Sequence, residues 1–316
     1  MIHAEGERKA PSHERYSEET ASDQMIVTCL PEGGEAMKNV GFIGAGKVAC
    51  SMGRYLSEKG VTVTGYSDTS EESADEAATF TSSKVFTSEK DVITASDCVF
   101  IATPDDVIAT VWDKIRTMDI RDKWIGIFSG SLSSNLFSGI EDTGAAGFSI
   151  HPMFAFSDRF SDYRQLHTAS FTMEGEPSCV ASVRAFFEDL GHTVSVIDSE
   201  KKMRYHAAAS VASNLMIGLY EMSLSMLTDC GFSKEEAGTF LSPLIRKNVT
   251  AMLQDGPVKA LTGPIERGDV ETVRHHLEVM TPEERAVYLP LARRLVEIAT
   301  VKNPERSYEA MCEVIG

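Results

Sequence analysis

The chain has 316 residues, and at the usual domain size this length suggests two globular domains. Its hydrophobic fraction of 42% excludes the disordered, collagen-like and low-complexity classes. The 47 acidic residues outnumber the 30 Lys and Arg residues, which gives a formal net charge of −17. Because this charge repels phosphate backbones and anionic lipids, neither a nucleic acid nor a membrane is expected as a partner.

The six cysteines include no Cys-x-x-Cys pair and no cluster with the spacing of zinc ligands. This usage indicates a reduced, cytoplasmic protein without a structural metal. The longest apolar stretch, residues 205–220, is interrupted by polar residues and is expected to be a buried helix rather than a membrane span. The N-terminus shows no basic start followed by an apolar core, so no secretory signal is expected.

Residues 1–37 are predicted to form an acidic, flexible tail, because they hold eight acidic residues against three basic ones and show no sustained periodicity. After this segment, short runs rich in β-branched and aromatic residues alternate with helix-length segments. Strands are expected at 40–43, 61–66, 84–87, 98–102, 125–128, 148–150, 171–173 and 193–197, and helices between them at 47–58, 71–78, 107–116 and 180–190. This alternation is typical of a doubly wound, mainly parallel sheet with helices on both faces.

The strand signals stop after residue 198. Helices are expected at 200–230, 233–253, 269–280, 282–298 and 304–314, separated by Gly and Pro positions. The sequence therefore predicts an α/β domain over residues 38–198 and an all-helical domain over 199–316, which we expect to bind substrate and to dimerise.

The most specific motif is Gly44-x-Gly46-x-x-Ala49, which follows the first predicted strand and opens a predicted helix. Gly44 permits a tight turn, Gly46 lets the backbone approach a pyrophosphate, and Ala49 keeps the helix close to the sheet. The phosphates would bind the N–H groups at the helix start, around Lys47 and Val48. The pattern predicts a dinucleotide-binding Rossmann domain, and the alternative is a tight turn that binds no ligand.

Asp68 lies 22 residues after Gly46, near the interval at which an acidic residue binds the ribose hydroxyls of NAD. The polar turn Ser67-Asp68-Thr69 could also hold the 2′-phosphate of NADP, and Asp68 could simply cap the next helix. The sequence leaves NADP and NAD both open as the cofactor.

Two further segments follow predicted strands and should line the same crevice. Thr103 and Pro104 follow the fourth strand, and Ser129 and Gly130 follow the fifth. Because the carboxyl ends of parallel strands form the ligand crevice, these residues could contact the ribose or the nicotinamide. Ordinary turn chemistry is the alternative for each of them.

With these motifs in place, the chain resembles the Rossmann-like oxidoreductases of the 6-phosphogluconate dehydrogenase-like superfamily whose C-terminal helical domain is a domain of unknown function. The matching segments are the glycine motif, Ser129-Gly130-Ser131, His151-Pro152-Met153, Tyr205-His206-Ala207 with Ser213-Asn214, and Leu261-Thr262-Gly263-Pro264. Ketopantoate reductase, pyrroline-5-carboxylate reductase and deazaflavin-dependent NADP oxidoreductases are relatives of this family. Two positions depart from it, since many members have Arg at the position of Asp68 and His at that of Phe128.

In the helical domain, His206, Ser210, Ser213 and Asn214 would share one face of a continuous helix, and Lys202 precedes His206 by four residues. Reduction of a carbonyl leaves an alkoxide, so the site needs a proton donor and hydrogen-bond donors. His206 suits the donor role, with Lys202 as the alternative acid, and Asn214 suits substrate orientation. The alternative is a stripe of small residues that packs against another helix, across a dimer for example.

Two further residues complete the predicted site. His151 is expected at the end of the sixth strand, where it would meet the nicotinamide or the substrate, and a structural His is an equal alternative. Arg267 could clamp a substrate carboxylate, although an Arg in such a turn more often pairs with a neighbour such as Glu266 or Asp269.

These observations predict an NAD(P)-dependent oxidoreductase that transfers a hydride between a nicotinamide cofactor and the carbonyl of a small anionic metabolite. A 2-oxo acid, as in ketopantoate reductase, is the first expectation. A prephenate-dehydrogenase-like or deazaflavin-dependent activity is the alternative among enzymes, and a non-catalytic nicotinamide-binding sensor is the alternative outside them. A homodimer is expected.

Overall fold

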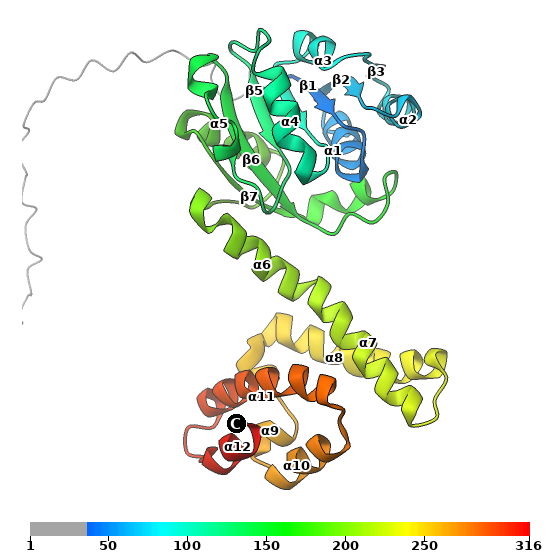
Figure 1. The fold of residues 1–316 in the computed structure, drawn as a ribbon, viewed down its shortest axis with the longest axis vertical. Coiled ribbons are helices and arrows are strands. Elements are labelled where there is room, and N and C mark those ends of the chain that lie inside the picture. Colours follow the sequence, from blue (N-terminus) through cyan, green and yellow to red (C-terminus); the bar gives the residue numbers. More distant parts are fainter. Residues whose placement is uncertain (1–36) are drawn as a thin grey trace, which may run out of the picture. The chain divides into compact units, whose positions relative to one another are not determined.

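A computed structural model describes residues 37–316. Of the tail predicted at 1–37, residues 1–36 lie outside the described residues, and Met37 is buried in the hydrophobic core. The chain divides into two compact units, one ending at Tyr205 and the other spanning residues 206–316. The sequence analysis places its boundary at residue 198, seven residues earlier. Figure 1 shows the strands within the first unit and only helices within the second.

The first unit contains one eight-stranded sheet in the order β3-β2-β1-β4-β5-β6-β7-β8. Its strands are β1 (Asn39–Ile43), β2 (Thr62–Ser67), β3 (Lys84–Val85), β4 (Cys98–Ile101), β5 (Trp124–Ile127), β6 (Ala146–Met153), β7 (Ser170–Gly175) and β8 (Val194–Val196). All neighbours are parallel except β6 and β7. The predicted mainly parallel, doubly wound fold is therefore confirmed.

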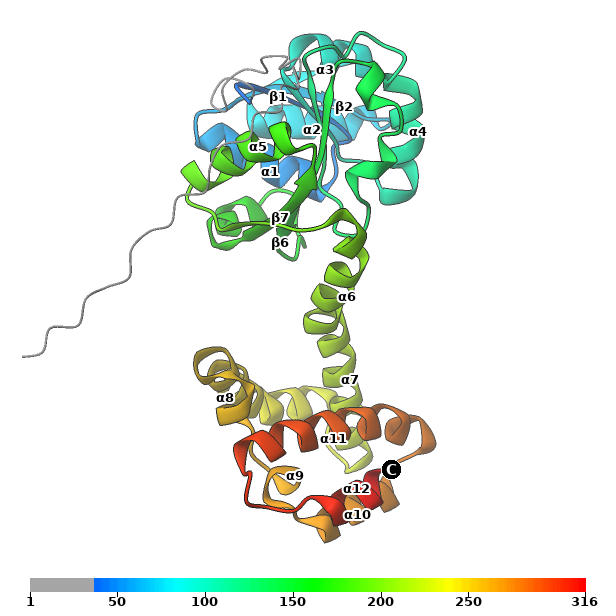
Figure 2. The ribbon, with the colours of Figure 1, turned by 90° about the vertical axis from the view of Figure 1, so that its left-hand side faces the viewer.

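Helices cover both faces of the sheet because successive side chains of a strand point to opposite faces. Helices α1 (Lys47–Glu58), α2 (Glu71–Thr81) and α5 (Pro177–Asp189) cover one face. Helices α3 (Glu89–Ala95) and α4 (Asp105–Ile115) and the short 3₁₀ helices η1 (Ser134–Leu136) and η2 (Ile140–Asp142) cover the other. Figure 2 shows α4 on one side of the sheet and α1 and α5 on the other.

Along β1, Phe42 packs into the core beneath α1 and Ile43 into the core beneath α4, as this alternation requires. Helix α3 escapes the sequence analysis because its buried apolar side chains are only Val92 and Ile93, too few for a helical period. Ser88 nevertheless starts this helix, since its hydroxyl accepts a hydrogen bond from the N–H of Asp91.

A stack of aromatic rings fills the core between the sheet and α1. The rings of Phe42 and Tyr66 lie 5.0 Å apart, and those of Phe100 and Phe128 lie 4.2 Å apart. Phe128, which stands where many members of the resembling family have His, is thus part of the hydrophobic core. We therefore assign it a packing role.

The second unit is helical, as predicted, but the single helix expected at 200–230 is wrong. The chain instead forms η4 (Ser199–Lys201), α6 (Lys202–Ala212) and α7 (Asn214–Asp229). Ser213 lies between α6 and α7, and its φ of −118° departs from the usual helical value. Its N–H still donates to the carbonyl oxygen of Ala209, and its own carbonyl oxygen accepts from the N–H of Ile217. Side-chain periodicity could not reveal this irregularity, since the apolar pattern continues across it.

The remaining helices are α8 (Lys234–Ala260), α9 (Pro264–Arg267), α10 (Val270–Val279), α11 (Pro282–Lys302) and α12 (Glu309–Ile315). Thr281 caps the start of α11, since its hydroxyl accepts from the N–H of Glu284 and the Glu284 carboxylate accepts from the N–H of Thr281. A hydrophobic core that includes Val273, Ala299 and Met311 is shared by the four helices α9, α10, α11 and α12. None of the helices in residues 37–316 combines the length and apolarity that crossing a membrane requires.

We expect the first unit to lose stability as the pH falls below about 6.5, the ordinary pKa of His. His192 is buried, with Nε2 2.7 Å from the Tyr55 hydroxyl and Nδ1 2.9 Å from the carbonyl oxygen of Ala169. Burial lowers the pKa of His192, so below pH 6.5 the unfolded chain binds a proton more readily than the folded one. The free energy of unfolding, measured in urea from pH 8 to 5, should fall by up to about 1.4 kcal/mol per pH unit from this group.

The His192→Gln variant should show a weaker pH dependence than the unmodified chain. The exposed His275 supplies the control, because His275→Gln should leave that dependence in the first unit unchanged. An equal slope in His192→Gln and the unmodified chain would contradict the assignment.

Candidate functional site

The glycine motif forms the turn that leads from β1 into α1. Gly44 has a φ of +104°, and a Cβ at this position would lie 2.6 Å from the carbonyl oxygen of Ala102, so only glycine fits. Gly46 is exposed, and a Cβ there would meet no atom within 4 Å. The space beside Gly46 is thus open to a ligand, while no side chain caps the start of α1 in the described residues.

These features fit a dinucleotide. The first N–H groups of a helix have no partner within it, and at α1 they belong to the turn around Lys47 and Val48. Lys47 is exposed and Val48 partly exposed, so this turn is accessible. A pyrophosphate can be bound there by backbone N–H groups, as the sequence predicts.

A crevice of about 700 Å³ lies at the carboxyl ends of β1, β2 and β4. The strand order reverses between β1 and β4, and this is where open α/β sheets bind their ligands. The predicted contacts in its wall are Gly44, Gly46, Ser67, Asp68, Thr103 and Pro104. The sequence analysis did not name Thr87, Ser88, Glu89 and Lys114, which also line it.

Asp68 joins the end of β2 to the glycine turn. One carboxylate oxygen accepts a hydrogen bond of 2.7 Å from the N–H of Ala45, and the other accepts one of 2.8 Å from the N–H of Ser70. The hydroxyl of the neighbouring Ser67 is buried and has no hydrogen-bond partner within the described residues. An orphaned polar atom in the wall of the crevice is a second observation that fits a bound ligand.

The turn after β5 is held together by its own side chains. Ser129 donates to the carboxylate of Asp105 at 2.8 Å, and Ser131 donates to the same oxygen at 2.7 Å. The Ser129 hydroxyl also accepts from the N–H of Leu132. Both Ser129 and Gly130 are buried. A ligand could therefore contact this turn only through its backbone or through the Ser129 hydroxyl, which already has hydrogen-bond partners within the fold.

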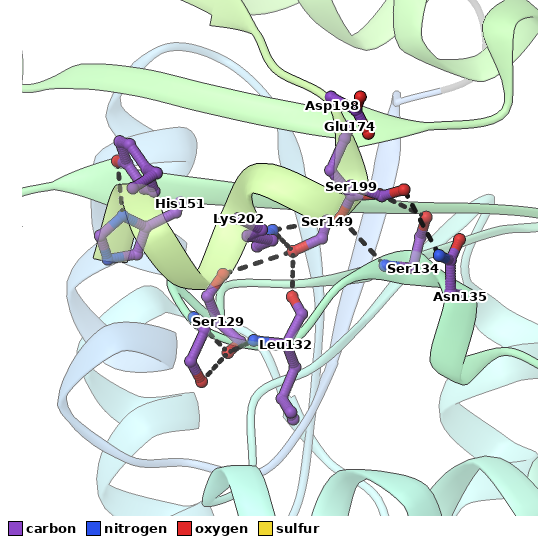
Figure 3. Close-up of polar contacts among 12 residues, drawn as sticks. Ser129, Leu132, Ser134, Asn135, Ser149, His151, Glu174, Asp198, Ser199 and Lys202 are labelled. Carbon is purple, nitrogen blue, oxygen red and sulfur yellow. Dashed lines mark hydrogen bonds and ion pairs between the residues drawn. The ribbon is translucent and has the colours of Figure 1, made fainter. Parts of the chain in front are cut away.

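Lys202, predicted as the alternative acid, is buried with 1% exposure at the start of α6. Its ammonium donates to the hydroxyl of Ser149 and lies 3.2 Å from a carboxylate oxygen of Glu174 (Figure 3). Glu174 also accepts from the N–H and the hydroxyl of Ser134. Burial lowers the pKa of Lys202, and the charge of Glu174 works in the opposite direction.

Tyr205, one turn after Lys202, contacts His151. The Tyr205 hydroxyl lies 2.9 Å from Nδ1 of His151, and the two rings meet edge to face. Burial raises the pKa of Tyr205, with a smaller opposing effect from a hydrogen bond to Thr172. The pair therefore presents a protonated phenol beside an imidazole at neutral pH.

Strand register explains why these two contacts occur together. Ser149 pairs with Glu174 across β6 and β7, and His151 pairs with Thr172. Because residues two apart on a strand share a face, all four side chains lie on one face of the sheet. Lys202 and Tyr205 are three residues apart, so they share one face of α6. Lys202 contacts the pair of Ser149 and Glu174, and Tyr205 contacts His151 of the other pair.

The position of His151 differs slightly from expectation. Strand β6 continues to Met153, so His151 lies within the strand rather than at its end. Strand β5 ends with Ile127 opposite Ser149, so His151 lies two residues beyond the last residue of β5. It thus projects at the crevice edge of the sheet, among the carboxyl ends of the parallel strands.

The other predicted site residues belong to the second unit. His206 and Ser210 lie on α6, while Ser213 lies between α6 and α7 and Asn214 begins α7. The continuous helix expected to carry these four residues is therefore irregular at Ser213. Arg267 has a side-chain exposure of 60% and lies 3.9 Å from Asp269, the surface pairing that the sequence analysis names as the alternative to a clamp.

Sequence reasoning missed Tyr205 and Glu174. Tyr205 belongs to one of the motifs that carry the family resemblance but has no predicted role of its own, and Glu174 lies just beyond the strand predicted at 171–173. The alternation of Phe171 and Met173 with Thr172 and Glu174 is the signal that could have identified Glu174. It places Glu174 on the face of the sheet opposite the core beneath α1 and α5. Within the described residues, no three His, Cys, Asp or Glu side chains gather into a metal-binding group.

Comparison with known protein families gives two matches in this chain. Residues 39–125 match the model described as NADP oxidoreductase, coenzyme F420-dependent. Residues 169–295 match the model described as a domain of unknown function, DUF2520. A search of curated proteins gives no match.

Solved structures share the fold. A protein described as an NADP oxidoreductase from Bacteroides fragilis is 23% identical, with 83% of this chain and 99% of that one covered and a TM-score of 0.66. A pyrroline-5-carboxylate reductase from Coxiella burnetii is 14% identical, with 85% and 97% covered and a TM-score of 0.54. A reductive aminase from Aspergillus terreus, solved with NADPH, is 16% identical, with 89% and 92% covered and a TM-score of 0.57.

We expect Glu174→Gln to destabilise the first unit by about 3–5 kcal/mol, because it leaves the buried Lys202 without its counter-charge. Urea unfolding measures this loss, and a double-mutant cycle with Lys202→Met should show strong coupling between the two positions. Glu188 supplies the control, since its ion pair with Arg184 is exposed and Glu188→Gln should cost under about 1 kcal/mol. Equal losses in the two Glu variants would contradict the buried pair.

Proposed function

We propose that this chain, an NAD(P)-dependent oxidoreductase with a Rossmann domain followed by a DUF2520 helical region, reduces the carbonyl of a small anionic substrate. A 2-oxo acid of the ketopantoate type is the first candidate. The observation that carries the proposal is the contact between Tyr205 and His151 at the crevice edge of the sheet. This contact supplies the proton donor that carbonyl reduction needs.

The cofactor supplies the hydride when it is bound. The chain's part in binding is the turn at Gly44 and Gly46, which leaves the start of α1 open to the pyrophosphate. Thr103 and Pro104 form the wall of the crevice beyond this turn, at the end of β4.

Tyr205 donates the proton that the reduced oxygen takes up. Its raised pKa keeps the phenol protonated at neutral pH until charge develops on the substrate oxygen. His151, which is partly exposed and contacts the Tyr205 hydroxyl through Nδ1, returns a proton to the phenolate and exchanges with solvent.

Lys202 acts through position rather than as the acid. Its ammonium is enclosed by Ser149 and Glu174, where a substrate oxygen has no access. The buried pair holds the first turn of α6 against β6 and β7, and this turn carries Tyr205. We therefore assign Lys202 as a positioning residue and keep His206 as the competing donor.

A C=N bond is the second candidate, favoured by the likeness to the pyrroline-5-carboxylate reductase and the reductive aminase. Hydride addition to a protonated imine gives a neutral amine and needs no further proton. A deazaflavin is a third candidate, because the model matched by residues 39–125 is described as coenzyme F420-dependent. Reduction of a C=O bond should therefore depend on Tyr205 more than reduction of a protonated C=N bond does.

The test measures oxidation of NADH and NADPH by the purified chain with ketopantoate, 1-pyrroline-5-carboxylate and a deazaflavin. If the carbonyl is the substrate, Tyr205→Phe should lower kcat at least about tenfold without changing the cofactor Kd. Loss of the proton donor should matter less for a protonated imine. Tyr163→Phe is the matched control, because Tyr163 packs against Phe80, away from the strand ends.

Unchanged kcat in Tyr205→Phe, together with a large loss in His206→Gln, would transfer the donor role to His206. A chain that binds cofactor but oxidises it with none of the three substrates would favour the non-catalytic sensor.

We further propose a homodimer formed through the second unit. Helices α7 and α8 expose large apolar side chains, among them Ile217 at 66%, Phe240 at 66% and Leu253 at 76%. Exposure on this scale is unusual for a monomer surface and typical of an association surface.

Analytical ultracentrifugation should therefore find a dimer, and Ile217→Lys with Phe240→Lys should shift it toward monomer. Val279, exposed at 80% on α10, supplies the control, since Val279→Lys should leave the mass unchanged. A monomeric unmodified chain at micromolar concentration would refute the dimer.

A further inference from the structure

We infer that the crevice selects NADH over NADPH, and that the Asp68 carboxylate is the selecting group. The inference rests on the proposed function, because it assumes that the crevice holds a nicotinamide dinucleotide. It concerns this chain in particular, since the B. fragilis relative is described as an NADP oxidoreductase.

Asp68 is placed where the adenosine ribose binds in folds of this type. It follows the last residue of β2, the strand next to β1 on the side away from β4, and it lines the crevice together with Ser67 and Thr69. An acidic residue about 20 positions after the glycine motif accepts hydrogen bonds from the ribose hydroxyls of NAD. NADP carries a phosphate in place of one of these hydroxyls.

The carboxylate is fixed by the backbone. Its two oxygens accept from the N–H groups of Ala45 and Ser70 at 2.7 and 2.8 Å. The hydroxyl of Thr69 also donates to Oδ1 at 3.4 Å, whereas Oδ2 accepts only from Ala45 among the described residues and keeps a lone pair able to accept a ribose hydroxyl. Rotation away from a 2′-phosphate would break two charge-assisted hydrogen bonds, so the negative charge stays in the wall of the crevice.

No unpaired cation offsets this charge among the described residues that line the crevice. Its charged side chains are Asp68, Glu89 and Lys114, and the ammonium of Lys114 lies 2.7 Å from both carboxylate oxygens of Glu89. A phosphate monoester adds a charge of about −1.5 to −2 at neutral pH, so the 2′-phosphate would meet a carboxylate in an already anionic wall.

Arg159, which approaches the glycine turn from the loop after β6, does not supply the missing charge. Its guanidinium donates to the carbonyl oxygens of Ala45 and Ser73 at 2.9 and 3.0 Å and forms an ion pair of 2.6 Å with Glu76. Both terminal nitrogens of the guanidinium are thus paired, and Nε, which has no hydrogen-bond partner among the described residues, is buried. A 2′-phosphate would have to displace Glu76 to reach the terminal nitrogen that pairs with it.

The test is the Kd of NADH and of NADPH for the full chain without substrate, measured by the change in nucleotide fluorescence. The unmodified chain should bind NADH at least about tenfold more tightly, the size expected when one hydrogen bond to a charged group is lost. Asp68→Asn should weaken NADH binding several-fold and strengthen NADPH binding, which reduces or reverses the ratio. Asp75→Asn on the exposed side of α2 removes one negative charge outside the crevice and should leave the ratio unchanged.

Glu89→Gln tests the same electrostatics without altering the Asp68 contacts to the glycine turn. It frees Lys114 from its counter-charge, so NADPH binding should strengthen several-fold and NADH binding should change little. If thermal melting shows that Asp68→Asn does not fold, the inference is still tested by Glu89→Gln and by the ratio of NADH to NADPH affinity of the unmodified chain.

Equal or tighter binding of NADPH by the unmodified chain would overturn the inference, as would an unchanged ratio in a folded Asp68→Asn. Tight NADH binding without turnover on any substrate would support it and count against the proposed function alone. Failure to bind either nucleotide would overturn both.

Discussion

The buried ion pair between Lys202 and Glu174 is the constraint on which the candidate site depends. A charge enclosed in protein is costly unless it is paired and hydrogen-bonded, and here Ser149 and Ser134 complete the pairing. The pair fixes the first turn of α6 on the face of β6 and β7. Residues three apart on α6 face cross-strand pairs two residues apart on β6, so Tyr205 contacts His151 when Lys202 contacts Ser149 and Glu174. Lys202, which the sequence predicts as an alternative acid, thus holds the helix turn that carries Tyr205.

The cofactor half of the site depends on a different constraint, the close approach of the glycine turn to the end of β4. Gly44 has no alternative side chain because Ala102 occupies the space, and Asp68 ties this turn to the end of β2. The same carboxylate therefore stabilises the turn and sets the charge of the crevice wall. A substitution at residue 68 would alter both properties at once.

Departures from the resembling family gain a physical meaning in the structure. Phe128 completes an aromatic stack in the core, so the loss of a His there concerns packing. Asp68 lines the crevice, so its departure concerns the charge of the crevice wall. Both positions follow buried strands and look alike in the sequence, and only their surroundings separate the two cases.

The sequence by itself determined the eight strands, the doubly wound sheet, the glycine turn and the helical second unit, because each depends on local periodicity or on turn chemistry. It could not determine the irregularity at Ser213, where the apolar pattern continues while the backbone φ departs from the usual helical value. Nor could it determine the partners of Lys202 and Tyr205. Glu174 and His151 lie 28 and 54 residues away in the chain, and only strand pairing in the folded sheet brings them together.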